Sequence, residues 1–171
     1  AHPEISENEF ETTAFLKEYI SKLGIRILET DLPTGFIAEI GHGKPVIALR
    51  ADIDALPIKE KNTFDYASQN GAMHACGHDF HQTSLLGAAE ILKAKEEQLK
   101  GTVRLIFQPA EEVSVGAYQV IENGGLKDVS AIIGYHNYPH LKPGEIGLRS
   151  KAIMAAVDKF KVTVSGVSGH A

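Results

Sequence analysis

The sequence has a single cysteine, Cys76, so no disulfide can form within the chain. Chains without disulfides are typical of reducing compartments, and we therefore expect a cytoplasmic protein. No apolar run approaches the roughly 20 residues that cross a bilayer, and no signal segment opens the chain, so we expect no membrane partner. Positive charge is also scarce: 17 Lys and Arg stand against 22 Asp and Glu, a net charge of −5, which argues against a nucleic-acid partner.

The remaining composition is that of a folded domain. The chain has 171 residues, of which 43% are hydrophobic and 23% charged, as in globular proteins. This length suits one domain of about 150 residues with a little left over. Because the chain stops directly after a strand-like run, we expect both of its ends to have been cut from a longer protein.

Alternating strand and helix patterns predict the fold class. Strand-like runs are expected at 25–29, 35–40, 45–50, 102–107 and 130–135. Helical spacing predicts helices over 79–99 and 115–123. Strands that alternate with helices indicate an α/β domain whose mixed, partly parallel sheet is flanked by helices.

Several local features refine this expectation. Ser6 and Glu9 have the spacing of a capping box that starts a first helix. The glycines of 41–43 predict a hairpin between the second and third strands. The run 130–135 is apolar enough to be a buried strand. The alternating run 159–165 predicts a half-exposed strand, which we interpret as the first element of a second domain.

Reactive side chains follow the strands of the predicted sheet. In open α/β sheets, ligands bind beyond the carboxyl ends of the strands. The polar residues found at these ends are Asp52, Asp54, Glu111, Glu112 and His136. Together with the loop before the long helix, these segments bring thiol, imidazole and carboxylate groups to one edge of the sheet.

That loop carries the strongest metal-ligand pattern. Cys76 and His78 lie two residues apart among small neighbours, and the helix that follows favours the thiolate a metal needs. The alternative is a buried cysteine beside solvated histidines. His74 and His81 are weaker candidates, as supporting residues or residues of the helix start. Mixed S, N and O donors suit zinc, manganese, cobalt or nickel, and not magnesium or calcium.

The other strand ends allow more than one interpretation. Adjacent carboxylates point in different directions, so Glu111 and Glu112 suit two roles, a metal ligand and a general base; the alternative is a solvated acidic loop. Asp52 and Asp54 follow a strand on the same side, so both could orient ligands or substrate; the alternative is an ion pair with Arg50. His136 ends an apolar strand, where a core histidine with satisfied hydrogen bonds is the usual alternative.

Taken in order, four motifs resemble those of dinuclear-metal amidohydrolases. They are RADIDALP at 50–57, HACGHDFH at 74–81, QPAEE at 108–112 and GYHN at 134–137. Nearly the whole chain is similar to the carboxypeptidase and aminoacylase relatives that include hippurate hydrolases, indole-acetyl-amino-acid hydrolases and N-acetyl-diaminopimelate deacetylases. The resemblance implies a zinc-exopeptidase-like catalytic domain over 1–155 and, over 156–171, the start of a smaller α+β lid and dimerisation domain.

The same resemblance implies a role for each site residue. The implied ligands of two divalent ions (Zn, Mn, Co or Ni) are the bridging Cys76, His78, Glu112 and His136. Glu111 would be the general base and Asp52 a supporting carboxylate. His170 resembles a lid histidine that reaches a neighbouring subunit's active site and stabilises the developing oxyanion. The family uses one further histidine ligand, far downstream of the last residue of this chain, so this piece alone lacks part of the implied site.

The implied reaction is hydrolysis of the amide bond of N-acyl amino acids or related small amides, by a homodimer. Two metal ions would lower the pKa of a water from about 15.7 towards about 7, and Glu111 would carry its proton to the leaving nitrogen. Two other functions stay open. Cys76 could be a nucleophile activated by His78 or His136, or the chain could belong to a metal-binding module without catalysis, although Glu111 argues against the latter.

Overall fold

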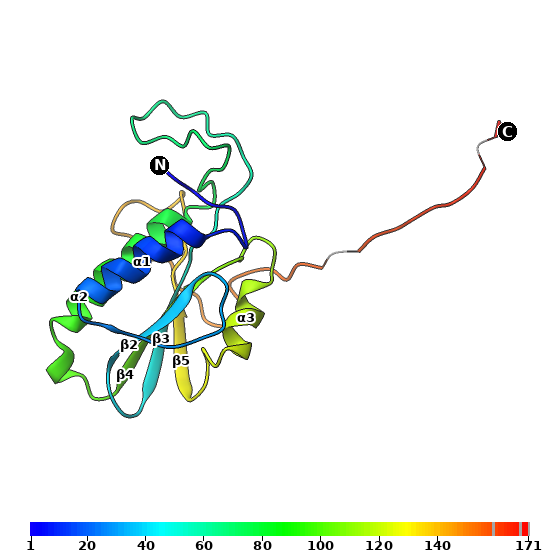
Figure 1. The fold of residues 1–171 in the computed structure, drawn as a ribbon. Helices are drawn as coiled ribbons and strands as arrows, with labels where there is room; N and C mark the ends of the chain where they lie inside the picture. The colour runs from blue at the N-terminus through cyan, green and yellow to red at the C-terminus, as the bar shows by residue number, and fades with distance from the viewer. Residues whose placement is uncertain (159, 168, 171) are drawn as a thin grey trace. The chain divides into compact units, whose positions relative to one another are not determined.

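A computed structural model of the chain describes residues 1–158, 160–167 and 169–170. The chain divides into two compact units, Ala1–Asn137 and Tyr138–Ala171. All helices and strands of the described residues lie in the first unit (Figure 1). Among these residues, none of the helices has the length and apolar character needed to cross a membrane.

A mixed five-stranded sheet forms the centre of the first unit, in the order β1-β2-β4-β3-β5. Its strands are β1 (Arg26–Ile27), β2 (Phe36–Gly41), β3 (Val46–Asp52), β4 (Thr102–Gln108) and β5 (Val129–Gly134). β3 runs parallel to β4 and β5, whereas β2 is antiparallel to β1 and β4. The predicted mixed, partly parallel sheet is thus confirmed.

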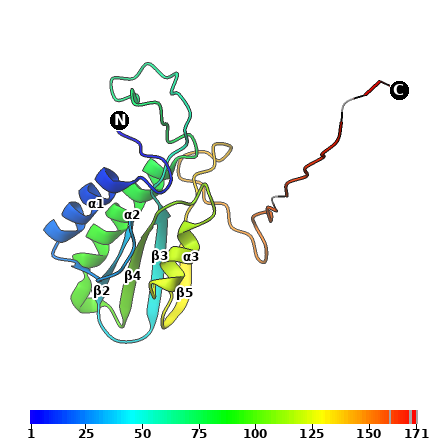
Figure 2. The same cartoon turned by 45° about the vertical axis from the view of Figure 1, so that its right-hand side comes forward.

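Helices cover both faces of this sheet. α1 (Phe10–Lys22) and α2 (His78–Lys93) lie side by side on one face, and α3 (Gly116–Glu122) lies on the other (Figure 2). Two apolar cores result, because side chains of successive strand residues point to opposite faces. α2 ends earlier than the predicted helix over 79–99, and the short 3₁₀ helix Glu96–Gln98 follows it.

The predicted hairpin between 35–40 and 45–50 is wrong, because β4 lies between β2 and β3. Phe36 pairs with Phe107 on one side of β4, and Val46 pairs with Thr102 on the other. β4 is buried along nearly all of its length. An apolar strand of this kind gains most at the centre of a sheet, where both of its faces are covered.

The predicted capping box of the first helix is also wrong. Glu9 is the N-cap of α1, but no side chain caps the helix from that position. The carboxylate of Glu4 instead accepts the N–H of Thr12 at 2.7 Å. Ser6 and Glu9 are therefore free to make contacts elsewhere in the fold.

The run predicted as a buried strand forms β5, but it is exposed. β5 pairs with β3 on one side and has no second neighbouring strand among the described residues. Ile132 and Ile133 are 49% and 59% exposed. Its apolar composition resembles that of a central parallel strand, although here it is an edge strand.

The second unit, Tyr138–Ala171, has no strand or helix in its described part. The strand predicted over 159–165 is not formed at 160–165, while Lys159 lies outside the described residues. A β-strand is stabilised by hydrogen bonds to a neighbouring strand. The described residues of this unit contain no strand that could pair with 160–165. The division into domains 1–155 and 156–171 stays a prediction.

Candidate metal centre

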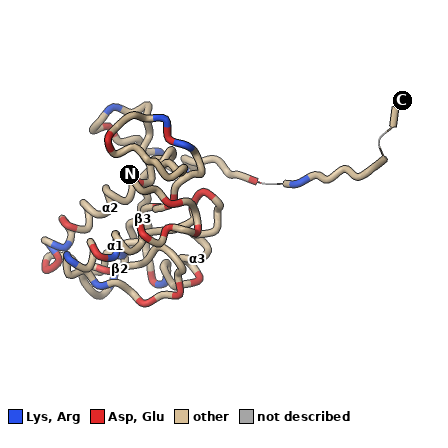
Figure 3. The backbone as a smooth tube through the Cα atoms, turned by 45° about the horizontal axis from the view of Figure 1, so that its top comes forward, with Lys and Arg blue, Asp and Glu red and all other residues tan. Residues whose placement is uncertain are grey.

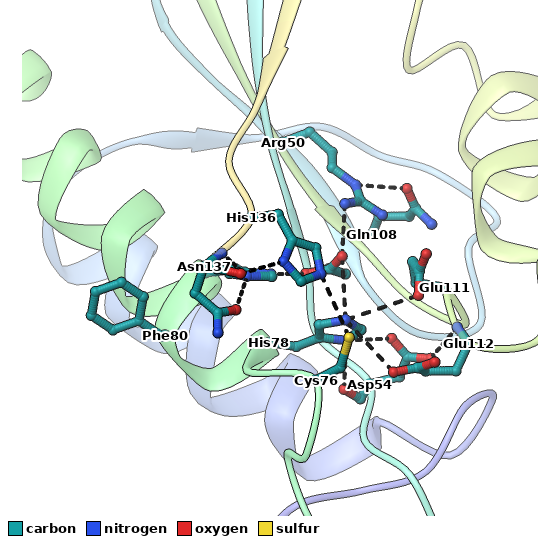
Figure 4. Close-up of polar contacts among 12 residues, drawn as sticks. Arg50, Asp54, Cys76, His78, Phe80, Gln108, Glu111, Glu112, His136 and Asn137 are labelled. Carbon is teal, nitrogen blue, oxygen red and sulfur yellow. Dashed lines mark hydrogen bonds and ion pairs between the residues drawn. The ribbon is translucent and has the colours of Figure 1, made fainter. Parts of the chain in front are cut away.

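Three strand ends and one helix start meet at a single edge of the sheet (Figure 4). β3 ends at Asp52, β4 leads into Glu111, and β5 leads into His136. α2 begins at His78, directly after Gly77, whose φ of +86° turns the loop into the helix. Acidic positions mark the segments around the end of β3 (Figure 3). Parallel pairing of β3 with β4 and β5 brings these ends together, as the strand-end argument predicted.

The four predicted ligands lie close together. Sγ of Cys76 is 3.5 Å from Nε2 of His136, and Nε2 of His78 is 3.8 Å from Oε1 of Glu112. Ligand atoms within 4.8 Å of one another form three groups: Cys76–His78–His136, Asp52–His78–His81 and His78–Glu111–Glu112. His78 belongs to all three groups, whereas the bridging role of Cys76 stays a prediction.

Two of these atoms are buried polar atoms without a hydrogen-bond partner in the part of the chain that the structure describes. They are Nε2 of His78 and Oε1 of Glu112. Leaving a buried polar group without a hydrogen bond costs about 1–3 kcal/mol. A cation between them would satisfy the imidazole lone pair and the carboxylate at once. With the thiol of Cys76 nearby, the donors are S, N and O, which fit a borderline divalent transition metal.

Asp54 fixes the orientation of His78. Nδ1 of His78 lies 2.9 Å from the backbone oxygen of Asp54 and 3.2 Å from its Oδ1. The Nδ1–H therefore donates to Asp54, and the lone pair of Nε2 faces the carboxylates. Oδ2 of Asp54 also accepts the N–H of Glu112 at 3.0 Å and the hydroxyl of Ser6 at 2.7 Å. The sequence predicted that Asp54, like Asp52, could orient ligands or substrate, and its contacts with His78 agree with that interpretation.

Asp52 connects the strand end to α2. Its Oδ1 is 2.6 Å from Nδ1 of His81, and its Oδ2 is 2.7 Å from Nη1 of Arg50. Burial by itself would raise the pKa of Asp52, but the hydrogen bond from His81 and the charge of Arg50 outweigh it and lower the pKa to about 2. The ion pair with Arg50 and the contact with a site histidine therefore coexist.

His81 was a weak candidate, and it links two parts of the site. It is 2% exposed, and its Nε2 lies 2.6 Å from Oδ1 of Asn137 and 2.9 Å from the Asn137 backbone nitrogen. Asn137 follows His136, so His81 holds the end of β5 onto Asp52. The HxxxxxxH spacing within 74–81 did not distinguish this supporting residue from a ligand.

The two adjacent glutamates differ as expected for two roles. The side chain of Glu111 is 41% exposed and that of Glu112 is 19% exposed. Burial, together with the charges of Asp52 and Glu112, raises the pKa of Glu111. A carboxylate that is open to solvent and has a raised pKa suits a general base.

The thiol of Cys76 is poorly suited to act as a nucleophile. Burial and the neighbouring carboxylate of Glu112 raise its pKa to about 11. Since the thiolate is the nucleophilic form, these surroundings disfavour the cysteine-nucleophile alternative. A cation at the same place would favour the thiolate as a ligand.

The remaining catalytic candidate is not part of the first unit. His170 belongs to the second unit, Tyr138–Ala171, and it is exposed. Its role at a neighbouring subunit's active site therefore stays a prediction. His74 lies beside the cluster, and its Nδ1 is buried without a partner among the described residues.

Comparison with known proteins shows a similarity that covers nearly the whole chain, beyond the four motifs of the sequence analysis. The chain is 54% identical over 173 residues to an N-acetyl-L-cysteine deacetylase of Bacillus subtilis, covering 99% of this chain and 42% of the relative. It is 45% identical to an IAA-amino acid hydrolase of Arabidopsis thaliana, covering 99% of this chain and 40% of the relative. The chain thus spans less than half the length of these relatives.

A solved structure shares the fold. It is a Bacillus subtilis protein described as a dinuclear metal binding peptidase from the M20 family, with 53% identity and a TM-score of 0.80 over 82% of this chain and 40% of that chain. The sequence pattern of peptidase family M20/M25/M40 matches residues 48–169. The cluster of thiol, imidazole and carboxylate groups lies within this match, and the chain belongs to peptidase family M20/M25/M40.

Proposed function

We propose that the whole protein hydrolyses the amide bond of N-acyl amino acids or related small amides, using two divalent transition-metal ions. One observation carries this proposal: Nε2 of His78, buried and without a hydrogen-bond partner among the described residues, lies 3.5 Å from Asp52, 3.8 Å from Glu112 and 3.9 Å from Glu111. The relatives named as a deacetylase of N-acetyl-L-cysteine and as an IAA-amino acid hydrolase support the substrate class.

The ligands in this proposal are Cys76, His78, Glu112 and His136. Zn, Mn, Co and Ni all suit their mixture of S, N and O donors. Ions held there would polarise the amide carbonyl and acidify water. Asp54 orients the imidazole of His78. Asp52 and His81 hold the segment that carries His136 in place.

Glu111 acts as the general base. Its carboxylate takes a proton from the attacking water, and the water oxygen forms a bond to the amide carbon. Glu111 then gives this proton to the amide nitrogen as the C–N bond breaks, which releases the carboxylic acid and the free amine. Such proton transfer contributes about 10² to 10⁴ in rate.

The proposal also includes the assembly and the compartment of the whole protein. Resemblance of the segment around His170 to a lid motif supports a homodimer in which this histidine serves the partner's site. A cytoplasmic location would suit a site built around the chain's single thiol, Cys76, because a reducing compartment keeps that thiol available as a ligand.

The test uses the full-length protein and measures release of free amino acid from a panel of N-acyl amino acids. Assays run with and without a chelator, and Mn, Zn, Co or Ni is added back. We expect activity that a chelator abolishes and a metal restores. Activity that is insensitive to chelators would favour the Cys76 nucleophile instead. Metal uptake at this cluster without any hydrolysis across the panel would favour a binding module.

A further inference from the structure

Glu9 is a carboxylate in an unusual place. It precedes the first residue of α1 and is 0% exposed. Ionisable side chains are almost never fully buried unless they are paired. Among the described residues, no Lys, Arg or His forms an ion pair with Glu9. Its burial therefore needs another explanation.

The two oxygens of Glu9 bind two different segments. Oε2 accepts the hydroxyl of Thr34 at 2.8 Å, and Oε1 accepts the backbone N–H of Ala110 at 2.8 Å. Ala110 lies 101 residues further along the chain, directly before Glu111. A single buried carboxylate thus connects the start of α1 to the segment that carries both glutamates of the site.

Ala110 is a position where the backbone needs support. Its φ is +48°, in the left-handed region that residues with a Cβ atom rarely adopt. Its N–H binds Glu9, and its carbonyl accepts the N–H of Gly116 at 3.1 Å and of Val115 at 3.3 Å. Both polar groups of Ala110 are therefore used to hold one turn.

The segments around this carboxylate are joined by further contacts. Thr13 in the first full turn of α1 accepts the N–H of Gly35 at 2.8 Å. A Cβ atom on Gly35 would lie 2.4 Å from the carbonyl oxygen of Phe107 in β4. The start of α1, the residues before β2 and the end of β4 are thereby packed tightly together, so Glu9 has a fixed position.

We propose that Glu9 is a positioning residue for Glu111 and Glu112, and that it acts through the backbone of Ala110. The proposal rests on the roles given to these glutamates in the proposed function. If the Ala110 N–H is released, the turn can leave the left-handed conformation, which rotates both following side chains. Catalytic geometry tolerates such shifts poorly, since a displacement of about 1 Å can cost about 10² in rate.

The chain offers variants that separate positioning from stability. Glu9→Met keeps the size of the side chain and removes both acceptors. Glu9→Gln keeps an oxygen for the Ala110 N–H, while its amide can donate to the Thr34 hydroxyl. Thr34→Val is the matched control, because it removes the other hydrogen bond of the same carboxylate and leaves the Ala110 contact intact.

The experiment uses the full-length, metal-loaded protein. For Glu9→Met we expect kcat to fall about 10- to 100-fold with little change in KM, and metal affinity to fall by about 10- to 100-fold. Hydrogen exchange should also be faster over 108–116. Glu9→Gln should stay within about threefold of the wild type in kcat, as a carboxamide oxygen can replace the acceptor. Thr34→Val should lower the melting temperature without these changes.

Each alternative result has a separate meaning. If Glu9→Met and Thr34→Val lower the melting temperature alike while kcat, metal affinity and exchange over 108–116 stay unchanged, Glu9 is only structural and the proposal is overturned. If the wild type hydrolyses no substrate, the proposed function fails, and metal affinity and exchange still test the positioning. Should Glu9→Met not fold, Glu9→Asp, which is too short to reach Ala110, must show the same losses.

Discussion

A methyl group added to Gly116 would lie 1.6 Å from the carbonyl oxygen of Pro109. This approach between the first residue of α3 and the residue after β4 closes the turn that carries Glu111 and Glu112. Only a residue without a Cβ atom permits it, since real Cβ contacts are never this short. Glu111 and Glu112 therefore lie in a turn that is closed by the contact between Pro109 and Gly116.

Replacement of this glycine should therefore destabilise the protein. We expect Gly116→Ala to lower the free energy of unfolding by about 1–3 kcal/mol, because the backbone must move to make room. Gly87→Ala is the control: its Cβ would have no neighbour within 4 Å, and α2 should gain about 0.5–1 kcal/mol. Urea unfolding of the full-length variants measures both. Equal stability of the two variants would contradict the close approach.

The two neighbouring glutamates should respond differently to the same substitution. Glu111→Gln should retain the metal and lose about 10² to 10⁴ in kcat, because the proton carrier is removed. Glu112→Gln should lower metal content, because a neutral amide is a weaker ligand than a carboxylate. Elemental analysis and amino-acid release on the same preparations distinguish them. Loss of metal from Glu111→Gln alone would mean that the two roles are exchanged.

Asp54 should control metal affinity without being a ligand. Asp54→Ala removes the carboxylate that contacts His78, Glu112 and Ser6. Loss of a residue that orients a ligand typically costs about 10- to 100-fold in metal affinity. Competition with a chromophoric chelator measures this change. Asp65→Ala, at an exposed loop carboxylate, should leave affinity unchanged, and an equal loss in both variants would point to net charge as the cause.

Asp52 should make the metal-free protein sensitive to acid. Its pKa falls from 3.8 to about 2 on folding, so its ionised form stabilises the fold above pH 3.8. This contribution of about 2 kcal/mol is lost as the pH falls from 3.8 towards 2. In the presence of a chelator, the difference in stability between the wild type and Asp52→Asn should shrink across this window. A difference that is the same at pH 5 and pH 2 would exclude this linkage.

The sequence was most informative about the strand ends. Asp52, Glu111 and His136 could be assigned to one edge because each follows an apolar run, and parallel strands end on the same side. The local pattern at Cys76 and His78 then predicted a metal site. Neither step required knowledge of which strands are neighbours.

Neighbour relations were where prediction from the sequence failed. The glycines of 41–43 indicated a hairpin, but β4, about 60 residues away, occupies the position between β2 and β3. Glu9 was explained locally, by a capping box, and His81 was assigned either to the helix start or to a supporting role without a named partner. Their actual partners include Ala110 and Asp52, at separations of 101 and 29 residues, and no local pattern contains such pairs.

β5 has no second neighbouring strand among the described residues, and this edge has a practical consequence for work on residues 1–171 alone. An uncovered strand edge can pair with a strand of another molecule, and β5 has exposed isoleucines at Ile132 and Ile133 and no charged residue. We expect solutions of this piece to form larger particles as concentration rises, visible by light scattering. The substitution Ala131→Lys places a positive charge on β5. Repulsion between these charges should prevent pairing of β5 between two molecules and so reduce the formation of larger particles.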